Sequence, residues 1–137
     1  MQCQDAMEGR AQPGHQQRMI LVVDDSPDAR ELWRVWLTYR GFDVIEARNG
    51  AEAVEQVTRH VPDLVLMDLT MPVMNGLEAL RVLRARQGAS ALPIIIVSGE
   101  GADAAQRARE LGSDAFMMKP VAPEVLLEHI HLLLGHH

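Results

Sequence analysis

The chain has 137 residues, of which 47% are hydrophobic and 23% are charged, and its formal net charge is −6. These values are typical of one soluble globular domain with a full hydrophobic core. The negative charge argues against a direct nucleic-acid partner, and no apolar run approaches the ~20 residues of a membrane span. The N-terminus lacks the apolar core of a secretory signal, and the single cysteine, Cys3, excludes an intrachain disulfide. We therefore expect a cytoplasmic protein.

Strand-like and helix-like segments alternate along the chain. Residues 1–18 are polar and are expected to form a flexible tail, and residues 135–137 a short C-terminal tail. Short apolar runs predict strands near 19–24, 42–46, 63–68, 93–97 and 114–118. Helical periodicity predicts helices near 27–40, 50–59, 76–87, 102–111 and 122–134. This alternation predicts one α/β domain over residues 19–134, a doubly wound parallel sheet of five strands with helices on both faces.

Apolar patterning indicates which faces are buried. The runs Leu64–Met67 and Ile94–Val97 do not alternate with polar residues, which is typical of strands covered on both faces. The first helix carries an apolar stripe that we expect to be buried, formed by Ala29, Leu32, Trp33, Trp36 and Leu37.

The last helix carries a second stripe, formed by Leu126, Leu127, Ile130, Leu133 and Leu134. Val125 and Leu132 lie partly off this stripe. We hypothesise that they form a contact for an output partner. The alternative is a slightly rotated helix that buries both.

Polar side chains follow four of the predicted strands at their carboxyl ends. Asp24 and Asp25 follow the first strand, Asp68 the third, Ser98 the fourth and Lys119 the fifth. Ligands of open parallel sheets bind at this edge. Neighbouring carboxylates repel one another and raise one another's pKa. A cluster of this kind usually holds a cation, and Mg²⁺ prefers oxygen ligands such as these. The set also suits phosphoryl transfer, because an aspartate can act as the nucleophile and a lysine can pair with a phosphoryl oxygen.

Taken in order, these motifs resemble the receiver domain of two-component response regulators, the class typified by the chemotaxis receiver. The resemblance rests on Val23-Asp24-Asp25, the segment from Asp68 to Gly76, Ser98, and the segment from Gly112 to Pro120. It covers roughly residues 19–134. It implies a flavodoxin-like sheet with strand order 2-1-3-4-5.

The resemblance also implies roles for individual residues. Asp68 is the expected phosphoacceptor, and Lys119 is expected to contact the phosphoryl group, with a cis bond to Pro120. Ser98 is the expected switch hydroxyl and Phe116 the switch aromatic. The expected Mg²⁺ ligands are Asp24, Asp25, Asp68 and the backbone carbonyl of Thr70.

The implied function is a phosphorylation-dependent signalling switch rather than a turnover enzyme. A histidine kinase or phosphotransfer protein is expected to donate the phosphoryl group, and the domain is expected to catalyse its own phosphorylation and dephosphorylation. Phosphorylation is expected to shift the surface of the fourth helix, fifth strand and fifth helix, and so to control an unknown output protein. No membrane partner is expected, and the chain is expected to be a monomer or a weak phosphorylation-linked dimer.

Two other functions remain open. One is a constitutive interaction module that keeps the fold without using the phosphate. The other is a phosphohydrolase, although those enzymes commonly carry Asp-x-Asp at the nucleophile, and Thr70 stands at the second position after Asp68. Since no output domain follows residue 134, we expect a standalone receiver; the alternative is a segment of a larger regulator or hybrid kinase.

Overall fold

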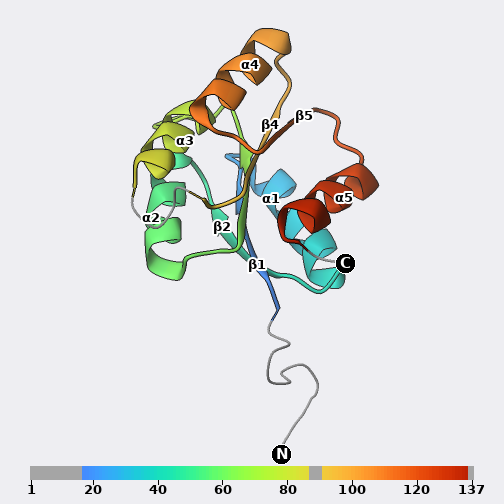
Figure 1. Cartoon of the computed structure of the whole chain (residues 1–137). Coiled ribbons are helices and arrows are strands. Elements are labelled where there is room, and N and C mark those ends of the chain that lie inside the picture. The colour runs from blue at the N-terminus through green and yellow to red at the C-terminus, as the bar shows by residue number, and fades with distance from the viewer. Residues whose placement is uncertain (1–16, 87–90, 136–137) are drawn as a thin grey trace, which may run out of the picture.

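The computed structural model describes residues 17–86 and 91–135 (Figure 1). The strands are β1 (Met19–Val23), β2 (Asp43–Ala47), β3 (Leu64–Asp68), β4 (Ile94–Ser98) and β5 (Ala115–Met118). The helices are α1 (Pro27–Tyr39), α2 (Gly50–His60), α3 (Gly76–Ala85), α4 (Ala102–Leu111) and α5 (Pro123–Leu133). All strand pairs are parallel, and the order is β2-β1-β3-β4-β5. The predicted fold class and strand order are confirmed; residues 1–16 and 136–137 of the predicted tails lie outside the described residues.

The sheet separates two apolar layers, because successive strand side chains point to opposite faces. Leu21, Val65 and Ile96 belong to the layer under α2, α3 and α4. Ile20 and Ile95 belong to the layer under α1 and α5. Figure 1 shows these two groups of helices on opposite sides of the sheet. The central strands β1, β3 and β4 are therefore covered on both faces, as the continuous apolar runs of β3 and β4 predicted.

One predicted core residue is wrong. Leu32 is 69% exposed, whereas Leu37 on the same helix is fully buried and Trp33 and Trp36 are half-buried. Leu37 lies five positions after Leu32, which places the two about 140° apart around a helix with 3.6 residues per turn. The sheet covers the side of α1 that carries Leu37, so Leu32 points away from it.

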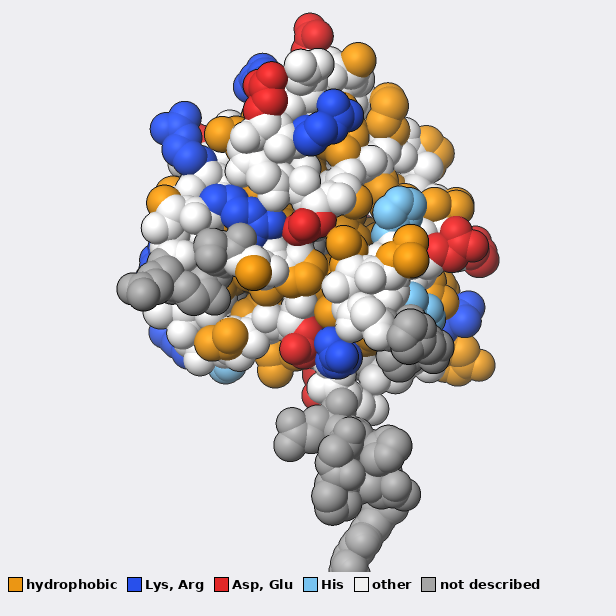
Figure 2. Space-filling model, viewed as in Figure 1, with side chains coloured by type: hydrophobic (Ala, Val, Ile, Leu, Met, Phe, Trp, Pro, Cys, Tyr) orange, Lys and Arg blue, Asp and Glu red, His pale blue; other side chains and the backbone are white. Residues whose placement is uncertain are grey.

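Helix α5 exposes the two apolar residues that lie off its buried stripe. Leu132 is 78% exposed and Val125 is also exposed, while Leu126 and Ile130 are fully buried. In Figure 2, hydrophobic side chains and histidines gather on the right of the molecule, over α5. The alternative of a rotated helix that buries both residues is therefore excluded.

Two glycines fix the loop between β3 and α3, which follows Asp68. The backbone N–H of Gly76 donates to the Leu69 carbonyl over 2.8 Å, and that of Gly50, at the start of α2, donates to the Met74 carbonyl over 2.8 Å. A Cβ at Gly76 would lie 2.6 Å from the Asp68 carbonyl oxygen, and one at Gly50 would lie 2.5 Å from the Met74 carbonyl oxygen. Since no side chain fits such distances, glycine lets α2 and α3 approach this loop closely.

Candidate functional site

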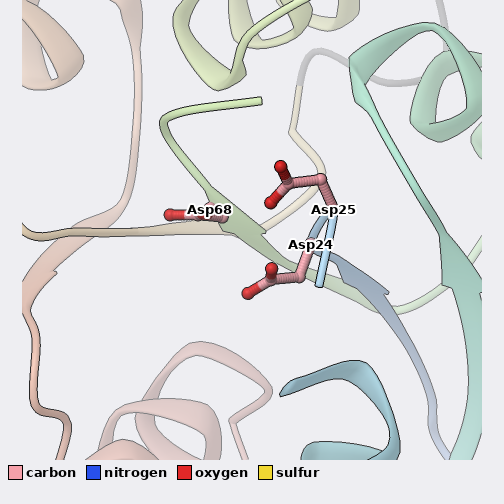
Figure 3. A group of neighbouring side chains, drawn as sticks. All are labelled: Asp24, Asp25 and Asp68. Atoms are coloured by element: carbon pink, nitrogen blue, oxygen red, sulfur yellow. The ribbon is translucent and has the colours of Figure 1, made fainter. Parts of the chain in front are cut away.

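Three carboxylates meet at the carboxyl edge of the sheet. Asp24 and Asp25 directly follow β1, and Asp68 is the last residue of the neighbouring strand β3. One carboxylate oxygen from each residue lies within 4.8 Å of the other two. Figure 3 shows the three side chains pointing to the same side from adjacent strand ends. Asp24 and Asp68 are buried and Asp25 is exposed, so the cluster opens to solvent at Asp25.

The side chain of Lys119 is a cationic neighbour of Asp68. The Lys119 Nζ lies 3.2 Å from Asp68 Oδ1, and the lysine side chain is 45% exposed. Burial raises the pKa of the Asp68 carboxyl, and the charge of Asp24 raises it further, while the hydrogen bond and charge of Lys119 oppose the shift. Lys119 therefore offsets only part of the free-energy cost of ionising Asp68 in this buried, acidic surrounding. The peptide bond between Lys119 and Pro120 is cis.

Ser98 and Thr70 border this cluster. Ser98, at the end of β4, is buried; its hydroxyl accepts a hydrogen bond from the Glu100 N–H at 2.8 Å, and its carbonyl accepts one from the Lys119 N–H at 2.9 Å. The Thr70 hydroxyl donates to a Glu100 carboxylate oxygen over 3.2 Å. Ser98 is thus linked through the backbone to the lysine, and Thr70 and Glu100 form a hydrogen-bonded pair at the exposed rim.

Phe116 lies on the edge strand β5, apart from the acidic cluster. It is half-buried and packs against the apolar layer under α2, α3 and α4. It also lines a shallow depression between α4 and β5, together with Ala105, Arg109 and Ser113. The structure therefore brings Asp24, Asp25, Asp68 and Lys119 together and leaves Phe116 at a separate surface.

The acidic cluster has the composition of a site for a hard cation. Its donors are three carboxylates, which are the oxygen ligands that Mg²⁺ and Ca²⁺ prefer. Two of the three are buried, and Asp68 has a raised pKa, so a cation there would relieve both repulsion and desolvation. Asp24, Asp25 and Asp68 could therefore hold a metal ion.

Arg30 is a neighbour of this site that the sequence did not reveal. Its guanidinium donates a hydrogen bond to the backbone carbonyl of Asp24 over 2.8 Å. Nothing in the local pattern of α1 distinguishes Arg30 from the other charged residues of that helix, because its partners lie on other elements.

The response regulator receiver domain family matches residues 20–131 of this chain. The chain belongs to this family. The receiver domain is 36% identical over 117 residues to protein PilH of Pseudomonas aeruginosa, covering 85% of this chain and 97% of the relative. It is 37% identical over 119 residues to chemotaxis protein CheY1 of Helicobacter pylori, covering 85% of this chain and 96% of the relative.

Solved structures agree with this assignment. The receiver domain is similar to the chemotaxis protein CheY4 of Vibrio cholerae, with a TM-score of 0.81 and 28% identity, covering 86% of this chain and 99% of that one. It is also similar to the signal receiver domain of a histidine kinase from Syntrophus aciditrophicus, with a TM-score of 0.81 and 33% identity. This match covers 86% of this chain and 90% of that one.

Family membership defines the general role of the domain. Receiver domains of two-component signalling are signalling switches, generally not classed as enzymes, and they interact with histidine kinases or phosphotransfer proteins and with output partners. Within residues 17–86 and 91–135, no helix has both the length and the apolar character needed to cross a membrane.

Proposed function

We propose that this receiver domain is a phosphorylation-dependent switch and that Asp68 is its phosphoacceptor. The observation that carries the proposal is the position of the Asp68 carboxylate between two further acids and the ammonium of Lys119, at the carboxyl edge of a parallel sheet. This edge is where open α/β sheets bind their ligands.

The chemical step is the transfer of a phosphoryl group to a carboxylate oxygen of Asp68. That oxygen attacks the phosphorus atom of a donor phosphohistidine, and a new O–P bond forms as the P–N bond breaks. The bonding electron pair leaves with the imidazole nitrogen, which takes up a proton. Water later attacks the aspartyl-phosphate, which releases inorganic phosphate and restores the carboxylate.

The side chains around Asp68 suit this transfer. Lys119 already lies 3.2 Å from Asp68 Oδ1, so its ammonium can pair with a phosphoryl oxygen when Asp68 becomes esterified. Asp24, Asp25, Asp68 and the backbone carbonyl of Thr70 would hold Mg²⁺. When bound, the ion supplies positive charge that offsets the repulsion between these carboxylates and the incoming phosphoryl group.

We further propose that phosphorylation changes the surface formed by α4, β5 and α5. Ser98 would turn its hydroxyl from the Glu100 N–H toward a phosphoryl oxygen, and Phe116 would turn inward into the space that this frees. The half-buried position of Phe116 beside α4 supports this rearrangement. The exposed apolar residues Leu132 and Val125 would belong to the contact with the output protein.

The partners follow from the same proposal. The donor would be a histidine kinase or a phosphotransfer protein, and the output would be another protein rather than nucleic acid or a membrane. The domain would be a monomer or a weak phosphorylation-linked dimer, and a cytoplasmic location stays a prediction.

The decisive experiment is phosphorylation by a small donor. Wild-type protein and Asp68→Asn are incubated with acetyl phosphate and Mg²⁺, and the intact mass of each is measured beside a chelated sample. We expect one phosphoryl adduct on the wild type and none on the variant or in the chelated sample. An adduct of equal yield on Asp68→Asn would refute the assignment of Asp68. No adduct even with a kinase donor would favour a constitutive interaction module.

A further inference from the structure

Asp24 is held in place by bonds to three different parts of the fold. Its backbone N–H donates to the Ala47 carbonyl at the end of β2 over 3.1 Å. Its carboxylate oxygen Oδ1 accepts a hydrogen bond from the Ser26 N–H at 2.9 Å. Its backbone carbonyl accepts one from Arg30 Nη1 at 2.8 Å. The arginine thus contacts, from α1, the turn that presents Asp24 and Asp25.

Arg30 is itself fixed by a second bond. Its Nε lies 3.1 Å from Glu46 Oε1 on β2, and its side chain is only 13% exposed. A guanidinium carries its donors in a rigid planar fork, so two bonds in different directions leave it little freedom. Arg30 therefore ties the backbone of Asp24 to β2 through Glu46.

Arg34 provides a natural comparison on the same helix. Its Nε pairs with the other oxygen of Glu46, Oε2, at 3.2 Å, and its side chain is 42% exposed. No hydrogen bond joins Arg34 to Asp24 among the bonds of the described residues. The two arginines share a charge, a helix and a carboxylate partner, and they differ in burial and in the contact with the acidic turn.

We propose that Arg30 is a positioning residue for the metal site, and this inference rests on the function proposed above. By holding the Asp24 carbonyl, Arg30 fixes the turn and hence the directions of the Asp24 and Asp25 carboxylates. Without that bond, repulsion among the three acids drives the turn outward and the ligands separate before the cation binds. Groups that orient metal ligands commonly contribute about 10–100-fold in affinity. Because Arg30 acts through the backbone of a ligand residue, we expect the lower end, about tenfold.

The sign of the effect separates positioning from simple charge. A cation near the site repels Mg²⁺, so a residue that acted only through its charge would weaken metal binding, and its removal would tighten it. A positioning residue has the opposite effect: its removal weakens binding although a repulsive charge has been lost.

The test compares Arg30→Met with Arg34→Met. Each variant loses one positive charge and one ion pair with Glu46 and keeps an apolar stem, so the two are matched in charge and in ion-pair partner, although Arg30 is the more buried. The full chain is titrated with magnesium chloride at constant ionic strength, and the amide signals of Asp25 and Ser26 are followed by nuclear magnetic resonance. We expect the dissociation constant to rise about tenfold in Arg30→Met and to change less than about twofold in Arg34→Met. Melting curves in chelator report the stability of each protein separately.

Three results would count against the inference. An unchanged or tighter dissociation constant in Arg30→Met, with normal binding by the wild type, overturns it and leaves the proposed function intact. Equal weakening in both variants overturns it too, because the effect would then belong to the shared ion pairs. Absence of Mg²⁺ binding by the wild type overturns the proposed function together with this inference.

A second variant keeps the test decisive if Arg30→Met does not fold. Arg30→Lys retains the charge and part of the stem but replaces the planar fork with a point donor. We expect an intermediate dissociation constant, and in metal-free protein we expect the Asp25 and Ser26 amide signals to shift more than in Arg34→Lys. Wild-type spectra and affinity in Arg30→Lys would contradict the positioning role.

Discussion

The close approach of α3 to β3, the strand that ends at the proposed phosphoacceptor Asp68, makes Gly76→Ala a sharp test of how the site is built. A Cβ at residue 76 would lie 2.6 Å from the Asp68 carbonyl oxygen and 2.9 Å from the Leu69 Cα. Ordinary van der Waals contact begins near 3.4 Å, so the shortfall for the oxygen is about 0.8 Å. Both neighbours are backbone atoms, which cannot move aside as a flexible side chain would.

The expected cost follows from this overlap. Forcing an extra carbon into a packed site typically costs about 1–3 kcal/mol, and the helix propensity of alanine offsets less than about 1 kcal/mol. For a domain of this size, each kcal/mol lowers the melting temperature by about 3–5 °C. Because the displaced backbone carries Asp68, we also expect slower phosphorylation by acetyl phosphate. Thermal unfolding followed by circular dichroism and intact-mass time courses measure the two effects.

Gly99→Ala is the matched control. Gly99 lies at the same edge of the sheet, just after Ser98, and a Cβ there would meet nothing within 4 Å. We expect its stability to stay within about 0.5 kcal/mol of the wild type or to rise slightly, since alanine restricts the unfolded chain. A Gly76→Ala protein as stable as Gly99→Ala would refute the view that glycine is needed for the approach of α3 to Asp68.

Three further predictions concern charge, capping and exposure. Burial and the charge of Asp24 raise the pKa of Asp68, so the ionised group lowers stability at any pH above that raised pKa. Asp68→Asn should therefore melt higher than the wild type at pH 7 without Mg²⁺. This gain should shrink as the pH falls from the raised pKa toward the ordinary aspartate value of about 4, and it should be absent below that value. A gain that did not change with pH would contradict the cause. Asn75 caps α3 in a reciprocal box with Glu78, so Asn75→Ala should cost about 1 kcal/mol in urea unfolding, and an unchanged midpoint would refute the cap. Leu132→Glu should change stability by less than about 0.5 kcal/mol, since the side chain is 78% exposed, and a large fall in melting temperature would show that it is buried.

Much of the fold could be predicted because its signals are local. The runs Leu64–Met67 and Ile94–Val97 are long enough and apolar enough to be central strands wherever their neighbours lie. Parallel strands have their carboxyl ends at the same edge of the sheet. Asp24 and Asp25 follow β1 and Asp68 ends β3, so the three acids could be expected to meet.

The remaining features depend on tertiary contacts that no local pattern encodes. An apolar stripe indicates that a helix has a buried face. The way α1 packs on the sheet then decides which part of the stripe is covered, so Leu37 is buried and Leu32 is not. Likewise, the bonds of Arg30 to Asp24 and Glu46 depend on the packing of α1 beside two different strands. The close contact of Gly50 with the Met74 carbonyl also arises only when α2 meets the loop after β3.

The uneven packing of the sheet suggests why the proposed phosphorylation of Asp68 would alter the structure at β5. Asp68 ends a strand that is buried along its whole length, whereas β5 is the half-buried edge strand that carries Phe116 and leads into Lys119. Segments with fewer buried apolar contacts open or shift at lower free-energy cost. The backbone bond between Ser98 and Lys119 joins the rigid interior to this looser edge. When Lys119 follows a phosphoryl group on Asp68, β5 and its neighbours would therefore adjust more readily than β3.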